Sequence, residues 1–241
     1  MRFFTIVSVL LAIAFFSSAS YARDESYFAK QLVLTIDGNL EEWDGSEIMA
    51  FDQLKDVGAE VPDAADFSGT GMIAWNSLDP DRVYFAATIT DDENQDIHPA
   101  TDTWWEDDSL EVMFDFTNDG SLVQWTIDAN GTEASAAFTE ENLDWIVVNN
   151  GNEYIFEGAI DPTKDNPDKP GFGVNFQGEV DLVVGLSMHY NDCENGVREH
   201  QMGWMPGGAW DAAAFGDLIF SGEILAVNLS GKLTTTWGGL K

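Results

Sequence analysis

Apolar and polar residues alternate along much of the chain with a period of two. In the run SLEVMFDF at 109–116, Leu110 and Val112 fall on one side of an extended backbone and Glu111 on the other. This period is typical of β-strands with one buried face, because a helix would repeat about every 3.6 residues. The pattern predicts strands at 82–90, 109–116, 121–128, 152–160 and 180–190, and shorter ones at 31–36, 71–76, 132–138, 143–148 and 215–220.

Turn-forming residues separate these runs. About ten short strands with frequent turns predict an all-β fold, namely an antiparallel β-sandwich of the jelly-roll or immunoglobulin-like kind. We find no amphipathic helix of useful length, no internal repeat and no domain boundary, so we expect one folded domain. The turn signals are Asp37-Gly38-Asn39, Asp79-Pro80-Asp81, Asn118-Asp119-Gly120, Asn130-Gly131 and Asn149-Asn150-Gly151.

The N-terminal segment has the order of a secretory signal peptide. Arg2 precedes an apolar run at 3–16, and SSASYA at 17–22 supplies small residues for cleavage after Ala22. The apolar run is shorter than the about 20 residues that a membrane-spanning helix needs. No later segment is apolar enough to span a membrane.

We therefore expect a signal peptide at 1–22 and a mature protein that begins at Arg23. The β-sandwich would occupy 23–227, and a polar C-terminal tail would follow at 228–241. The expected location is outside the cytoplasm: secreted, periplasmic or at the cell surface.

The composition excludes some partners. The chain has 43 Asp and Glu residues against 10 Lys and Arg, a net charge of −33. Nucleic acids and anionic lipids are poor partners for such a protein, because phosphate binding depends on Lys and Arg. The acidity could serve solubility alone, reflect a saline habitat or hold Ca²⁺. The single cysteine, Cys193, excludes an internal disulfide framework.

One acidic run is the best candidate for a structural Ca²⁺ site. Asp91, Asp92, Asn94 and Asp96 crowd hard oxygen ligands into one loop, where they would repel each other without a cation. The alternative is a solvated acidic loop. The same two alternatives apply to Asp107-Asp108 and Asn191-Asp192.

Nine tryptophans supply candidate chemistry. An exposed indole ring can stack on the apolar face of a sugar while polar neighbours bond the hydroxyls. Trp75, Trp125 and Trp145 lie in strand-like runs, where core packing is expected. Five others are framed by polar or turn residues: Trp43, Trp104, Trp105, Trp204 and Trp210.

Several segments together resemble a known family. IDGNLEEWDG at 36–45 is followed by TWWEDDSLEVMFDFTNDG at 103–120 and by AFGDLIF at 214–220. Between the last two lies GEVDLVVGLSMHYNDCENGVREHQMGW at 178–204. In this order, the chain resembles the family-9 carbohydrate-binding modules and their bacterial sugar-binding relatives over nearly all of 31–220. The resemblance implies an antiparallel β-sandwich, two tryptophans that clamp a terminal sugar, and structural calcium.

The resemblance also implies individual roles. Trp105, at the head of a W-x-x-D-x-x-E motif, matches the first clamp tryptophan, and Glu111 matches the acidic hydrogen-bonding residue. Trp210 is the expected second clamp tryptophan because the run GGA at 207–209 indicates an exposed loop. Trp204 is the alternative.

One feature departs from the family pattern. The basic sugar-binding residue should lie on the strand after Asp119, but that strand, SLVQWTID, has no Arg. Gln124 could replace it as a neutral donor and acceptor. Arg198, with Glu199 and Gln201, could supply further polar contacts.

Three other functions compete with sugar binding. Paired carboxylates can hydrolyse glycosides, but pairs arise by chance among 43 acidic residues, and no H-E-x-x-H zinc motif is present. We therefore expect no catalysis.

A b-type haem could use axial ligands from Met188, His189, His200 and Met202, although Met188 and His189 point to opposite faces of a strand.

The third alternative is a structural surface or matrix module without a small ligand. On the favoured interpretation the partner is a polysaccharide or oligosaccharide. The chain would then act alone or in a complex with an enzyme or at the cell surface.

Overall fold

The computed structural model describes residues 23, 25–95, 97, 104–131, 142–164 and 174–225. The expected signal peptide, the expected strand at 132–138 and the expected tail at 228–241 lie outside these residues. The described ranges form twelve strands and three short 3-10 helices. None of these helices is long and apolar enough to cross a membrane. The elements are β1 (Ser26–Gln31), η1 (Leu40–Trp43), β2 (Met49–Ala50), β3 (Gln53–Leu54), β4 (Phe67–Trp75), β5 (Val83–Asp91), η2 (Trp104–Glu106), β6 (Ser109–Asp115), β7 (Val123–Asp128), β8 (Leu143–Asn149), β9 (Glu153–Ile160), β10 (Val183–Glu194), β11 (Val197–Gly203), η3 (Ala212–Ala214) and β12 (Gly216–Ile224).

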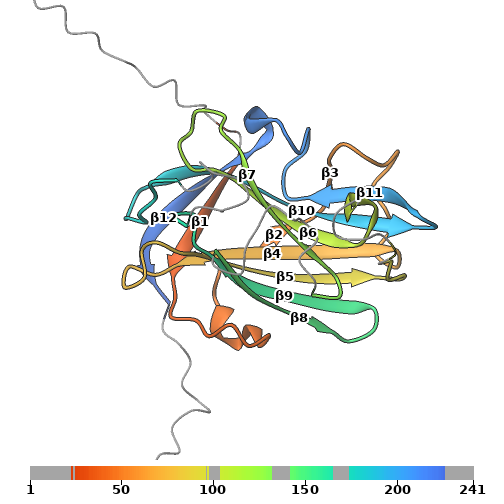
Figure 1. Ribbon diagram of the computed structural model, residues 1–241, viewed down its shortest axis with the longest axis horizontal. Helices are drawn as coiled ribbons and strands as arrows, with labels where there is room; N and C mark the ends of the chain where they lie inside the picture. Colours follow the sequence, from red (N-terminus) through yellow and green to blue (C-terminus); the bar gives the residue numbers. More distant parts are fainter. Residues whose placement is uncertain are drawn as a thin grey trace, which may run out of the picture.

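The strands form the two layers of a β-sandwich (Figure 1). One layer contains β7, β6, β10, β11 and β3, and the other contains β4, β5, β9 and β8. β12 pairs with β10, and β1 pairs with both β12 and β4, so these two strands connect the layers. Every pairing among the described strands is antiparallel except the two that β1 makes. The predicted all-β sandwich is confirmed, with twelve strands instead of ten.

The main core lies between the layers. Phe156 of β9 meets Tyr190 of β10 edge to face, with ring centroids 6.1 Å apart, and Phe67 of β4 stacks on the same tyrosine at 5.6 Å. On β6, Leu110, Val112 and Phe114 are fully buried in this core, as their alternation predicts. Such aromatic pairs stabilise the contact between the layers beyond simple area burial.

A second, smaller core lies on the outer face of β4, β5 and β9. Leu32 and Trp43 pack there with Tyr84, and Trp43 is only 2% exposed. Trp43 is therefore a core residue, although its polar neighbours in sequence indicated exposure. The strand predicted at 31–36 is wrong in its limits, because β1 ends at Gln31 and the next residues cover this outer face without joining a sheet.

A buried carboxylate holds this covering segment in place. Glu157 of β9 is fully buried and accepts hydrogen bonds from the backbone N–H groups of Asp37 (2.9 Å) and Gly38 (2.8 Å) and from Trp43 Nε1 (2.9 Å). Gly38 has a φ of +78°, a left-handed conformation that favours glycine. These contacts explain the IDGNLEEW sequence: it places two amides and one indole on a single carboxylate.

Some strands were missed because their alternate positions are not apolar. β11 reads VREHQMG, and polar residues occupy positions on both of its faces. Neither face therefore shows the apolar alternation that predicts a strand. β2 and β3 are two residues long, too short for any period to be visible. β10 runs to Glu194, beyond its predicted end at 190, because its polar second half pairs with β11.

Glu157→Gln tests the role of this carboxylate. The amide nitrogen would face N–H donors, so we expect the free energy of unfolding to fall by about 2–3 kcal/mol in urea denaturation. Glu153→Gln, at an exposed position of the same strand, is the control and should change it by less than about 0.5 kcal/mol. Equal effects of the two substitutions would contradict the proposed anchoring.

Candidate functional site

The face of β6 opposite the core carries buried polar side chains. Glu111 lies opposite Thr126 of β7 and His189 of β10 in the strand register, so the three share this face. All three are at most 2% exposed. Ser109, Gln124, Ser187, Asn191 and Gln201 are further buried polar residues of the same layer.

Glu111 is the centre of a hydrogen-bond network. Its Oε2 accepts from Gln124 Nε2 and from His189 Nε2, the latter at 2.9 Å. Its Oε1 accepts from Asn191 Nδ2 at 2.7 Å. Because the donors come from β7 and β10 on either side of β6, the carboxylate joins three strands of the layer.

The network continues to the edge of the layer through Asn191. Asn191 Oδ1 accepts from Arg198 Nη1 at 2.9 Å and from Gln201 Nε2 at 3.0 Å, both on β11. Thus Glu111, Gln124 and Arg198, which the sequence indicated separately, belong to one connected network. No pattern in the sequence indicated that Asn191 and His189 link them.

The pKa of Glu111 shows that the network holds a charged carboxylate. Burial alone would raise this pKa, but His189 nearby, its hydrogen bond and that of Asn191, and the charge of Arg198 lower it below its usual value. Glu111 is therefore ionised at neutral pH. The nitrogen of His189 that contacts it must carry a proton and act as the donor.

Sequence reasoning missed one cation on this face, Lys55. Its N–H donates to the carbonyl of Gln201 at 2.8 Å, directly after β3. Its side chain crosses Gly203 beside His189, because a Cβ added at Gly203 would lie 3.2 Å from Lys55 Cδ and 2.8 Å from His189 Cβ. Burial lowers the pKa of Lys55 to about 8, although Asp56 and Glu111 act in the opposite direction. No periodic signal could have found it, since it follows a two-residue strand.

Two exposed tryptophans lie on loops anchored to this layer. Trp105, in η2, is 40% exposed, and its carbonyl accepts from Cys193 Sγ of β10 at 3.8 Å. Trp210 is 64% exposed, and the preceding Ala209 donates its N–H to Asp56 Oδ2 at 2.8 Å, next to Lys55. The backbone at Trp105 is thus held at β10, and the backbone just before Trp210 is held beside β3.

The alternative second tryptophan, Trp204, is placed differently. It is half-buried at the edge of the main core and packs edge to face on Tyr27, with centroids 6.1 Å apart. It lines a separate hollow of about 480 Å³ with residues such as Glu25 and Asp52. Trp204 therefore packs at the edge of the main core and borders a different hollow, whereas Trp210 is the more exposed of the two.

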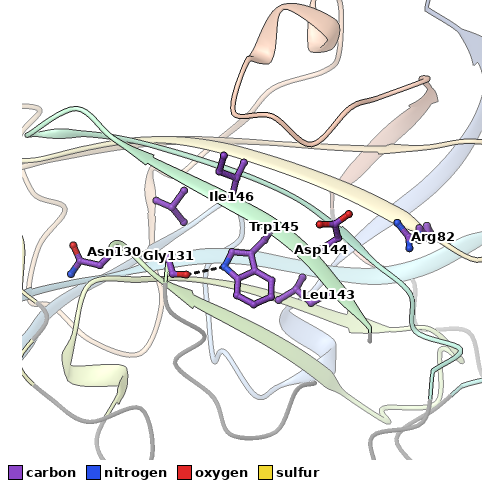
Figure 2. A pocket seen from close by; sticks show the side chains of 8 residues that line it. Arg82, Asn130, Gly131, Leu143, Asp144, Trp145 and Ile146 are labelled. Atoms are coloured by element: carbon purple, nitrogen blue, oxygen red, sulfur yellow. Dashed lines mark hydrogen bonds between the residues drawn. The ribbon is translucent and has the colours of Figure 1, made fainter. Parts of the chain in front are cut away.

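A second hollow, of about 590 Å³, lies along β8 (Figure 2). Trp145 lines it, with its Nε1 donating to the carbonyl of Gly131 at 3.1 Å. Arg82 and Asp144 stand at one end of it. Trp145 was predicted to be a core residue, and it does pack against the main core while its ring also borders this hollow.

Three buried aspartates converge beside the network. Asp91 of β5, Asp108 before β6 and Asp192 of β10 each offer a carboxylate oxygen, and these oxygens lie within 4.8 Å of one another. Asp108 accepts from the N–H of Gln95 at 2.6 Å and of Cys193 at 2.9 Å. Asp91 Oδ2 is buried without a hydrogen-bond partner. We call these three residues the aspartate cluster.

Burial dominates the titration of this cluster. Burial first, and the charges of neighbouring carboxylates after it, raise the pKa of Asp91 to about 9, of Asp108 to about 8 and of Asp192 to about 7. Removing water from a carboxylate disfavours its charged form. A bound cation would have the opposite effect and stabilise the charges.

The expected Ca²⁺ ligands only partly coincide with this cluster. Of the four predicted residues, Asp91 belongs to it, whereas Asp92 and Asn94 are exposed and Asp96 lies outside the described residues. The carboxylates that come together are supplied by three separate segments of the chain. Asp108 and Asp192 belong to the two other pairs that the sequence indicated, but spacing along the chain could not show that they converge on Asp91.

The four candidate haem ligands face different surroundings. Met188 and Met202 are buried in the main core, whereas His189 bonds Glu111 and His200 Nδ1 contacts Asp192 Oδ2 at 3.2 Å. Met188 and His189 do point to opposite faces, as predicted. This arrangement disfavours an iron held between them.

Comparisons with known proteins agree with the fold. A family model described as carbohydrate family 9 binding domain-like matches residues 36–223. No curated protein matches the sequence. A carbohydrate binding module family 9 from Caldicellulosiruptor kristjanssonii, solved with cellotriose, has a TM-score of 0.64 at 14% identity, covering 85% of this chain and 100% of that chain. Its structure with glucose gives 0.63 at the same identity and coverage. At this identity the structures show a shared fold.

The aspartate cluster predicts how stability depends on pH. Because its pKa values are raised in the folded protein, the cluster's contribution is complete below the unfolded value of about 4 and is lost as pH rises through about 7 to 9. With a chelator present, we expect Tm to fall between pH 6 and pH 9, and Asp91→Asn to reduce that fall. Asp92→Asn is the exposed control. A Tm that stays constant or rises over this range would contradict the account.

Proposed function

The chain belongs to the carbohydrate family 9 binding domain-like family, and we propose that it is an exported protein that binds a saccharide without transforming it. The observation that carries this proposal is the pairing of a connected polar network with two exposed tryptophans on anchored loops. Sugar sites combine an apolar platform with a few convergent polar groups. The expected signal peptide at 1–22 supports export, to the periplasm, the cell surface or the medium.

In this proposal Trp105 and Trp210 stack on the sugar from the two ends of the network face. Gln124 and Arg198 bond its hydroxyls, since Gln124 is 8% exposed and Arg198 is half-buried at the edge. Glu111 is 2% exposed, and three described donors already bond its oxygens, so its main role is to position Gln124 and Asn191. One acceptor position of its four remains for a ligand hydroxyl.

The titration of Glu111 supports a binding role rather than glycoside hydrolysis. A glycosidase needs a carboxylic acid with a raised pKa beside a second carboxylate that lies near the bond to be cleaved. The pKa of Glu111 is lowered, which makes it a poor proton donor. The aspartate cluster has raised pKa values but is at most 1% exposed.

We also propose that the aspartate cluster holds a structural Ca²⁺. The donor set fits, because Ca²⁺ takes about six to eight hard oxygen ligands and backbone carbonyls or water can complete the three carboxylates. The unpartnered Oδ2 of Asp91 is the atom that most needs a cation. Asp108 also accepts from the N–H of Gln95 and lies three residues after Trp105, so the ion would stabilise the position of Asp108 and Gln95.

Trp105→Ala tests the stacking role. We expect it to weaken saccharide binding about tenfold to a hundredfold in titration calorimetry, because the ring contributes about 1–3 kcal/mol. Cellotriose and glucose are the first probes, since the similar solved structures contain them.

Phe28→Ala is the matched control, because Phe28 is an aromatic residue of β1 that is 47% exposed and lies outside the network layer. Its affinity should equal that of the wild type. If Trp105→Ala binds as tightly as Phe28→Ala, the stacking role of Trp105 is refuted. Binding of no saccharide in a glycan array by the wild type would refute the proposed function.

Asp91→Asn tests the calcium site. Ca²⁺ should raise the Tm of the wild type and of Asp92→Asn by several degrees, since a ligand that binds only the folded state stabilises it. The same ion should leave Asp91→Asn nearly unchanged. A Ca²⁺-dependent rise that survives Asp91→Asn would place the ion elsewhere.

A further inference from the structure

Two of the described Lys and Arg residues lack a carboxylate partner, although the protein is strongly acidic. Most described Lys and Arg side chains have a carboxylate partner at 3.1 to 3.8 Å, namely Arg23, Lys30, Arg82 and Lys164. Within the described ranges, Lys55 and Arg198 are the Lys and Arg residues without such a partner. With 43 acidic residues in the chain, a counter-ion for each was easily available.

The two unpaired cations lie on the same face. Arg198 extends over the network and bonds Asn191, and the stem of Lys55 crosses Gly203 beside His189. Both act electrostatically on Glu111, so both lie close to the centre of the network. They reach this face from opposite ends of β11.

Each also has a nitrogen with nothing to bond. Lys55 Nζ and Arg198 Nε are buried and have no hydrogen-bond partner. Leaving such a charged donor unsatisfied is costly, typically about 1–3 kcal/mol or more. Lys55 Nζ and Arg198 Nε are therefore two hydrogen-bond donors on charged groups that lack a partner, on the face where the saccharide is proposed to bind.

From this arrangement we infer that the saccharide is acidic, with a uronic-acid carboxylate that accepts hydrogen bonds from Lys55 Nζ and the Arg198 guanidinium. The inference rests on the proposed function and adds the class of sugar to it. A carboxylate fits both groups, because the planar guanidinium matches its two oxygens and the ammonium supplies a point charge.

The charge states suit such a ligand at neutral pH. Burial lowers the pKa of Lys55 to about 8, which leaves its ammonium mostly protonated at pH 7. Glu111 is negative, but its charge is shared among donors from Gln124, His189 and Asn191. Asp56, the other carboxylate that acts on Lys55, also accepts a hydrogen bond, from the N–H of Ala209, whereas Lys55 Nζ and Arg198 Nε have no partner.

The test compares sugars that differ only in the carboxylate. Titration calorimetry of the full chain at pH 7 would use D-glucuronate against D-glucose and D-galacturonate against D-galactose. We expect the acid of one pair to bind at least tenfold more tightly than its neutral counterpart. Lys55→Met keeps the stem and removes the charge, and it should reduce this ratio about tenfold. Lys30→Met, which removes an ion-paired lysine of β1, is the matched control and should leave the ratio unchanged.

The outcomes separate the two proposals. Neutral sugars that bind as tightly as the acids, or an acid preference that survives Lys55→Met, would overturn this inference and leave the proposed function standing. Binding of no sugar in either pair or in a glycan array would overturn both. Because Lys55 makes no side-chain hydrogen bond among the described residues, Lys55→Met leaves the Glu111 network intact, and its binding of the neutral sugar reports that the variant is folded.

Discussion

A charged carboxylate held out of water, that of Glu111, is the interaction on which the polar face of this sandwich depends. A buried charge is costly unless hydrogen bonds compensate it. Here the compensation comes from Gln124 on one side and from His189 and Asn191 on the other. The register of β7, β6 and β10 must therefore be kept, since a slip of one residue would turn Glu111 into the main core.

The seven residues of the W-x-x-D-x-x-E motif contribute to three features of the structure. Trp105 presents an exposed ring, Asp108 joins the aspartate cluster, and Glu111 centres the network. Asp108 also accepts from the N–H groups of Gln95 and Cys193, so it ties Gln95 to β10. In the proposed function, a cation at the cluster would act on sugar binding through Asp108, three residues from Trp105, without contact with the sugar.

Much of this could be predicted from the sequence, for identifiable reasons. The alternation in β6 correctly placed Leu110 and Val112 in the core and Glu111 on the opposite face, because strand periodicity acts locally. Contacts between segments that are far apart in the sequence produce no such local pattern. The partners of Asp91, the position of Lys55 and the packing of Trp204 depend on which strands become neighbours, and β11 and β3 carried no apolar period to reveal them.

The proposed function requires that a saccharide lie between Trp105 and Trp210 over the Glu111 network. The most direct test is a titration with saccharide followed by NMR, with the indole N–H signals and the side-chain amide of Gln124 assigned. If the saccharide binds there, the signals of Trp105, Trp210 and Gln124 should shift together and saturate at one concentration, while that of Trp145 in the β8 hollow stays constant. Shifts confined to Trp145, or shifts of Trp204 without Trp105, would contradict binding at this face.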